Sequence, residues 1–145
     1  GYVHTVTDLW TVHNYEQDPA KLAAALAPGA AGVWRNFPDL EPAYGGQPYL
    51  VDEYGGTKWN PADLERSGES WGYGNTPRSI EEVYARIDGL TKALLEHDHI
   101  CGYCYTQLTD VEQEQNGIYF YDRAVKFDLA RIHAVFSRKP AWAAI

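Results

Sequence analysis

Three short runs of apolar, β-branched and aromatic residues divide the chain at wide intervals, and each is followed by a loop and then by helix-forming sequence. The runs cover 8–13, 49–54 and 100–106, and each has the length and composition of a β-strand. Strands that alternate with helices are typical of a parallel sheet, because parallel neighbours need a crossover connection. The alternation therefore predicts an α/β fold, in one domain over residues 1–145.

Each strand run leads to a segment that carries a helix start signal. Asp18, followed by proline, has the character of an N-cap ahead of an Ala/Leu-rich run. Ser79, with glutamate three residues later, has the spacing of a capping box. Apolar residues at three- and four-residue steps then predict a helix over 80–95. Asp128 predicts the start of a last helix over 129–136.

The number of strand–helix units limits the architecture. A complete (β/α)8 barrel, or TIM barrel, has about 250 residues, or roughly 31 per unit. The 145 residues of this chain contain three such units and one long loop. We therefore expect a partial TIM barrel, and the absence of methionine is also expected of a piece of a longer protein. Half a barrel exposes the edges of its first and last strands, so we expect self-association through those edges.

Composition excludes several classes of partner. The formal net charge of −8 excludes a nucleic acid or an anionic membrane surface, because either requires a basic patch. No apolar run is long enough to span a membrane, and a soluble, cytoplasmic protein is favoured. The 11 Tyr and 5 Trp residues suit a surface that binds sugars, since flat rings pack against the C–H face of a pyranose.

Cys101 and Cys104 form a C-x-x-C pattern within the third strand run. Positions three apart on a strand point to opposite faces, and no second pair of cysteines completes a zinc site. We therefore expect two free, buried thiols, no metal and no cofactor.

Glu53 lies at the C-terminal end of the second strand run, immediately before Tyr54 and a pair of glycines. In (β/α)8 barrels the catalytic residues lie at this end of the strands. A carboxylate there, among aromatic side chains, suits the nucleophile of a retaining glycosidase, which attacks the anomeric carbon and forms a covalent glycosyl-enzyme. The glycines allow a sharp turn and leave room for a ligand. The structural alternative is a glutamate that is merely exposed at the end of a strand.

Three consecutive segments resemble glycoside hydrolase family 2, which contains β-galactosidases, β-glucuronidases and β-mannosidases. Residues 47–56 (QPYLVDEYGG) are similar to the family's nucleophile strand, the seventh of its barrel. Residues 8–15 (DLWTVHNY) resemble the sixth strand, and residues 102–117 (GYCYTQLTDVEQEQNG) resemble the eighth strand with its following loop. Lys126-Phe127 is similar to the approach to the last barrel helix. The matches follow the family's order and cover nearly the whole chain.

The resemblance implies that Glu53 is the nucleophile of an O-glycosyl hydrolase that acts on β-glycosides with retention of configuration. A β-galactosidase is favoured because such enzymes are frequent in the family. The implied substrate-binding residues come from all three segments and the loop after the second: His13, Asn14, Tyr15, Tyr54, Trp59, Trp71, Thr106 and Gln107. Thr106 departs from the Trp that β-glucuronidases have at this position.

Some of these residues keep a structural alternative. Trp59 and Trp71 lie in the loop after the nucleophile strand, where each is either a sugar platform or part of the loop's own packing. Glu112 and Glu114, in the loop after the third strand run, are expected to anchor that loop rather than to act in catalysis.

The family's acid/base residue is a Glu that follows an Asn, and no Asn-Glu pair occurs in these 145 residues. A retaining mechanism needs that second carboxyl group about 5–5.5 Å from the first, so we expect the chain alone to lack turnover. Two other functions stay open. One is a non-catalytic carbohydrate-binding or assembly module, and the other is an unrelated α/β enzyme that uses His13 with Asp52.

Overall fold

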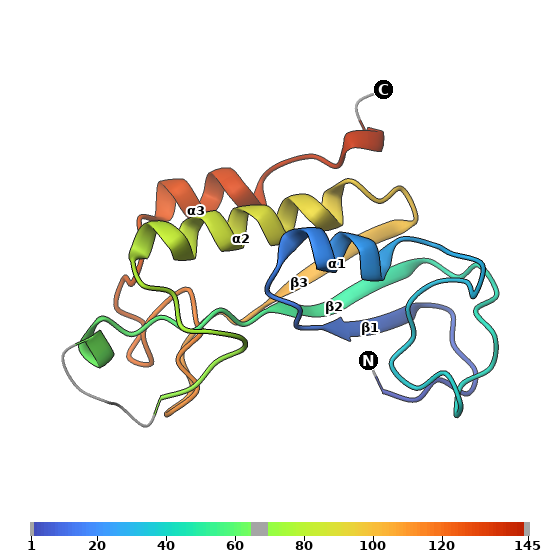
Figure 1. Cartoon of the computed structure of the whole chain (residues 1–145), viewed down its shortest axis with the longest axis horizontal. Coiled ribbons are helices and arrows are strands. Elements are labelled where there is room, and N and C mark those ends of the chain that lie inside the picture. Colours follow the sequence, from blue (N-terminus) through green and yellow to red (C-terminus); the bar gives the residue numbers. More distant parts are fainter. Residues whose placement is uncertain (1, 65–69, 144–145) are drawn as a thin grey trace.

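The chain forms a three-stranded parallel sheet, with its three α-helices on one side of the sheet (Figure 1). The computed structural model describes residues 2–64 and 70–143. The elements in chain order are β1 (Trp10–Asn14), α1 (Pro19–Leu26), β2 (Tyr49–Gly55), the 3₁₀ helix η1 (Pro61–Leu64), α2 (Ile80–Leu95), β3 (Ile100–Thr106), α3 (Leu129–Phe136) and the 3₁₀ helix η2 (Ala141–Ala143). β2 is the central strand and runs parallel to both neighbours. The predicted α/β fold with alternating strands and helices is confirmed.

The three predicted helix starts are also confirmed, because a side chain caps each N-terminus. The Asp18 carboxylate accepts hydrogen bonds from two backbone N–H groups in the first turn of α1. Ser79 Oγ accepts one from the N–H of Glu82 at 3.2 Å, and the Asp128 carboxylate accepts two in α3. These N–H groups have no partner within their own helix, so the caps determine where each helix begins.

Alternation along the strands separates two faces of the sheet. Trp10, Val12, Tyr49 and Val51 are fully buried and pack against apolar side chains of α1 and α2. The residues between and beside them on β1 and β2 are only partly buried and form what we call the open face: Thr11, His13, Leu50, Asp52 and Glu53. The core therefore lies between the sheet and the helices.

A bulge at Asp52 breaks this alternation near the end of β2. Val12 of β1 pairs with Val51, but the next residue, His13, pairs with Glu53, so Asp52 is an extra residue without a register partner in β1. Asp52 and Glu53 are both partly exposed, although they are neighbours on one strand. A bulge redirects side chains in this way, and here it leaves two adjacent carboxylates partly exposed at the end of β2.

The prediction that the two cysteines are buried is wrong. Cys101 and Cys104 are free and exposed. The register of β3 against β2 shifts at both positions, since Leu50 pairs with Gly102 and Tyr54 with Tyr105. These shifts remove the strict alternation on which the prediction depended, and β3 has no neighbour on its outer side within the described residues.

Side chains from two loops occupy part of the outer edge of β1. The backbone N–H of Thr11 donates to His4 Nε2 at 3.2 Å, and the ring of His4 is held by Glu41 at 2.7 Å. The side-chain amide of Asn36 makes two bonds of 2.8 Å to the backbone N–H and C=O of His13, as a neighbouring strand does. The expectation of an unpaired edge on β1 is therefore wrong at Thr11 and His13.

The loop after β3 is held by a buried ion pair. Lys126 Nζ lies 2.6 and 2.9 Å from the two carboxylate oxygens of Asp110, and both side chains are almost completely buried. Asp110 Oδ1 also accepts a hydrogen bond from the N–H of Gly117 at 2.8 Å. Burial lowers the pKa of Lys126, and Asp110 opposes that shift.

In the part of the chain that the structure describes, no helix is long and apolar enough to cross a membrane.

Candidate active site

Glu53 lies near the C-terminal end of the central strand, where two side chains from the β1 side converge on it. The hydroxyl of Tyr15 donates a hydrogen bond to Glu53 Oε2. His13 Nδ1 lies 3.0 Å from the same oxygen. Among the described residues, none donates a hydrogen bond to Oε1, and 41% of the Glu53 side chain is exposed. One carboxylate oxygen is therefore oriented by the protein, and the side chain as a whole is partly exposed.

Tyr15 follows β1 directly and is suited to act as a permanent hydrogen-bond donor. Burial, and after it the hydrogen bond to Glu53, raises the pKa of Tyr15 well above the usual range of a phenol. The phenol consequently keeps its proton at any pH at which the protein works. Its oxygen also lies within hydrogen-bond distance, 3.2 Å, of Thr106 Oγ1 at the end of β3. The ends of all three strands thus meet at Tyr15 and Glu53.

His13 is held between two carboxylates. Its Nδ1 faces Glu53 at 3.0 Å and its Nε2 faces Asp52 Oδ1 at 3.4 Å. Since the two ring nitrogens point in different directions, the bulge at Asp52 is what allows both acids to reach one imidazole. A neutral ring donates one of these bonds, and a protonated ring donates both.

The two glycines after Tyr54 are required by aromatic neighbours rather than by a ligand. Gly55 and Gly56 have φ angles of +83° and +64°, a region that favours glycine. A Cβ on Gly55 would lie 2.3 Å from the ring of Tyr105, and one on Gly56 would lie 2.4 Å from the ring of Tyr73. The room that the sequence suggested for a ligand is filled by these two rings.

Three of the predicted substrate-binding residues lie elsewhere. Tyr54 is fully buried on the helix side of the sheet, where its hydroxyl bonds Thr91 of α2 at 2.8 Å. Asn14, its register partner, is buried as well and accepts a hydrogen bond from the backbone of the β1–α1 loop. Trp59 is 5% exposed and belongs to the hydrophobic cluster beneath the loops. Trp59 is thus part of loop packing, and these three predictions are corrected.

Trp71 and Gln107 lie in the two loops that follow β2 and β3. The Trp71 side chain is 47% exposed, and its backbone pairs with the segment 113–115 through two bonds of 2.7 and 2.9 Å. Gln107, which follows a cis peptide bond, donates from its side chain to Asn116 at 2.8 Å. Asn116 in turn donates to Glu114 Oε1 at 3.1 Å, which agrees with the expectation that Glu114 anchors the loop.

Two residues at the site were not predicted from the sequence. Tyr73 stacks flat on Tyr15, with 3.6 Å between ring centroids and 6° between ring planes. Gln17 accepts from Thr57 at 2.8 Å and donates to the carbonyl groups of Tyr15 and Gly55, so it connects the loops after β1 and β2. The cluster of aromatic residues in the loop after β2 is the signal that could have indicated Tyr73. Gln17 carries no local signal.

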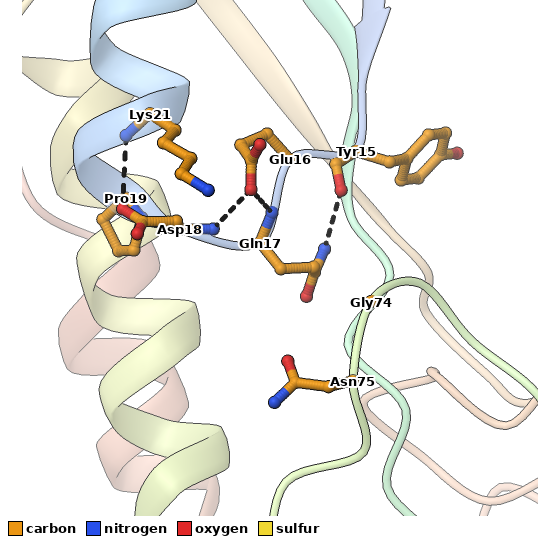
Figure 2. Close-up of a pocket in the computed structure, with 8 residues that line it drawn as sticks. All are labelled: Tyr15, Glu16, Gln17, Asp18, Pro19, Lys21, Gly74 and Asn75. Atoms are coloured by element: carbon orange, nitrogen blue, oxygen red, sulfur yellow. Dashed lines mark hydrogen bonds between the residues drawn. The ribbon is translucent and has the colours of Figure 1, made fainter.

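A cavity with a volume of about 590 Å³ lies next to Tyr15, and Glu53 does not line it. It is lined by the loop after β1 and a turn of the loop after β2: Tyr15, Glu16, Gln17, Asp18, Pro19, Lys21, Gly74 and Asn75. Figure 2 shows the Tyr15 ring directed away from this cavity and the Asn75 side chain directed toward it. The partly exposed Glu53 is therefore not part of this cavity.

No group of three or more His, Cys, Asp or Glu side chains in residues 2–64 and 70–143 is arranged to hold a metal ion. Comparison of the sequence with protein-family models and with curated proteins gives no match.

Proposed function

We propose that this chain carries the nucleophile of a retaining β-glycoside hydrolase similar to glycoside hydrolase family 2, with Glu53 as the residue that forms the glycosyl ester. One observation supports the proposal above all others. Glu53 lies at the C-terminal end of the central parallel strand, and Tyr15 and His13 both engage its Oε2. Donors on one oxygen orient a carboxylate and leave the other oxygen for attack, as a nucleophile requires.

The arrangement of the sheet supports the barrel part of the proposal. The strands lie in chain order, β1-β2-β3, and all α-helices lie on one side of them (Figure 1). Consecutive units of a (β/α)8 barrel have this arrangement, whereas a doubly wound sheet carries helices on both faces. We infer that the three units correspond to strands six to eight of such a barrel, and that the open face corresponds to the barrel interior.

The proposed chemistry needs one further group. Glu53 Oε1 attacks the anomeric carbon, the bond from that carbon to the aglycone oxygen breaks, and the departing oxygen takes a proton from a general acid. Water later cleaves the ester, with the same group as base. No Asn-Glu pair occurs in the chain, so the proposal assigns this role to a carboxyl group outside these 145 residues. The substrate that we favour is a β-galactoside.

An activated substrate tests the nucleophile without the acid, because a dinitrophenolate leaves unprotonated. We expect 2,4-dinitrophenyl 2-deoxy-2-fluoro-β-galactoside to label the chain slowly, with one adduct on Glu53 detected by mass spectrometry of the intact chain and its peptides. Glu53→Gln should abolish the adduct, and the matched variant Glu112→Gln, in an exposed loop, should keep it. An adduct on another residue would overturn the assignment, and steady hydrolysis of an ordinary disaccharide would contradict the missing acid.

A non-catalytic carbohydrate-binding module is the second candidate, and the exposed ring of Trp71 favours it. Such a module binds β-galactosides but forms no adduct. Isothermal titration with a β-galactoside should detect binding in either case, and Trp71→Ala should weaken it. The adduct on Glu53 separates the two functions, because only the enzyme forms it. We also propose self-association of the chain. The outer edge of β3 is the favoured contact, because loop side chains occupy part of the β1 edge.

A further inference from the structure

We propose that Tyr73 is a positioning residue, which holds the Tyr15 phenol on Glu53 and thereby orients the nucleophile. The inference rests on the proposed function, since the orientation of Glu53 matters to catalysis only if Glu53 reacts. Tyr73 acts through its ring contact with Tyr15 and not on the reacting atoms.

The orientation of the Tyr15 ring plane depends on the stack with Tyr73. Tyr15 lies just beyond β1, outside the regular hydrogen bonding of the sheet. Its hydroxyl contacts Glu53 and Thr106 at one end of the side chain. Its ring meets the ring of His13 edge-on at 6.4 Å and 79°, and the flat stack with Tyr73, at 3.6 Å and 6°, is its closest ring contact. A hydroxyl contact alone lets the ring rotate about its long axis and tilt, whereas a parallel stack on one face restricts both motions. Tyr73 therefore supplies the restraint that keeps the phenol oxygen near Glu53.

Tyr73 is itself held firmly by the chain around it. Its backbone N–H donates to the carbonyl of Gly56 at 2.9 Å, next to a short bridge with Thr57. The edge of its ring meets the ring of Trp71 at 6.0 Å and 77°. These contacts tie the loop after β2 back to the residues that directly follow the nucleophile strand. The stack on Tyr15 is consequently part of a defined structure and not a chance contact of a long loop.

The identity of Gly56 follows from the same contact. A Cβ at this position would lie 2.4 Å from a ring carbon of Tyr73, closer than atoms approach in proteins. The glycine thus provides the space in which the Tyr73 ring reaches Tyr15. The second glycine of the Glu-Tyr-Gly-Gly sequence is therefore needed for the ring that supports the nucleophile, and the nucleophile lies three residues before this glycine.

The ring of Tyr73, and not its hydroxyl, carries the proposed role, because the hydroxyl makes no hydrogen bond with any residue of 2–64 and 70–143 that would need to be preserved. Two substitutions distinguish the role of the ring from that of the hydroxyl. Tyr73→Phe keeps the stacked ring and should label Glu53 at the wild-type rate. Tyr73→Leu removes the flat face and should slow labelling by about tenfold, the size of one weakened hydrogen bond to a charged group. Tyr121→Leu, at an exposed tyrosine, is the matched control.

A double variant distinguishes positioning from a general structural loss. Tyr15→Phe removes the hydroxyl, so Tyr73→Leu should add little further slowing in that background if Tyr73 acts through Tyr15. Additive losses would overturn the proposal, as would a wild-type labelling rate for Tyr73→Leu. Melting temperatures identify any variant that is unfolded at the assay temperature, and Gly56→Ala, which displaces the Tyr73 ring by a different route, then takes the place of Tyr73→Leu.

Crystal structures of the variants give a readout that does not depend on labelling. We expect the Tyr15 hydroxyl to stay on Glu53 in Tyr73→Phe and to leave it in Tyr73→Leu. If the wild-type chain fails to label but the phenol moves as expected, the proposed function fails while the positioning role stands. If the wild-type chain labels and the phenol stays on Glu53 in Tyr73→Leu, the positioning role fails while the proposed function stands.

Discussion

The hydroxyl of Tyr15 donates a hydrogen bond to Oε2 of Glu53, although 38 residues separate the two in the sequence. The contact exists because β1 and β2 pair in parallel, so that the C-terminal ends of both strands lie at one edge of the sheet. His13 reaches the same oxygen at 3.0 Å. Both partners engage Oε2 and neither engages Oε1.

His13 should contribute to the reactivity of Glu53 more than Asp52 does. His13 Nδ1 lies 3.0 Å from Glu53, whereas Asp52 faces the other ring nitrogen of His13, Nε2, at 3.4 Å. We expect His13→Gln to slow labelling of Glu53 by about tenfold, the loss of one hydrogen bond to a charged group, and Asp52→Asn to slow it less. The rate of adduct formation measures both. A larger effect from Asp52→Asn would mean that Asp52 takes a direct part in the reaction.

Removing one partner of the Asp110–Lys126 pair should destabilise the loop after β3. Both side chains are almost completely buried, and a buried charge that has lost its partner costs about 3–5 kcal/mol. We expect Lys126→Met to lower the free energy of unfolding by about that amount. The double variant Asp110→Asn/Lys126→Met should recover most of the loss, because Asn keeps an acceptor for the N–H of Gly117. Urea unfolding followed by circular dichroism checks both, and equal instability of the single and double variants would contradict this account.

The stability of the chain should fall in mild acid partly because of His99. Burial lowers the pKa of His99, and the neighbouring ring of His97 adds to the shift. The unfolded chain therefore binds a proton at a higher pH than the folded chain does, so this contribution to stability is complete above about pH 6.5 and is lost as the pH falls through the lowered value. We expect His99→Phe, which keeps a ring beside Tyr49, to reduce the slope of unfolding free energy against pH between about 5 and 7. An unchanged slope would exclude His99 as its source.

Asn36 should protect the outer edge of β1 from pairing with another chain. Its side chain makes two 2.8 Å bonds to the backbone of His13 and so occupies groups that a second strand would use. We expect Asn36→Ala to increase self-association in sedimentation velocity, while Asn75→Ala, at an exposed position in the loop after β2, leaves it unchanged. If Asn36→Ala sediments as the wild type does, β1 takes no part in association.

Local patterns in the sequence determined the elements of the fold. Three apolar runs predicted the strands, and the caps Asp18, Ser79 and Asp128 predicted the helix starts, because hydrophobic periodicity and capping act between residues close in the chain. The position of Glu53 at the end of the middle strand could be read in the same way. Tyr15 and His13 were named only as substrate-binding residues, through the family resemblance, and no local rule places them on the same oxygen of Glu53.

Only the tertiary structure decided which side chains meet. The bulge at Asp52 turns two neighbouring carboxylates toward His13, and the register shifts in β3 expose both cysteines. Tyr54 and Tyr15 are both tyrosines near the predicted nucleophile, yet one is buried against α2 and the other binds Glu53. A single extra residue in a strand changes the face to which the following side chains point. That extra residue is specified by packing between strands distant in sequence, which no pattern within one strand contains.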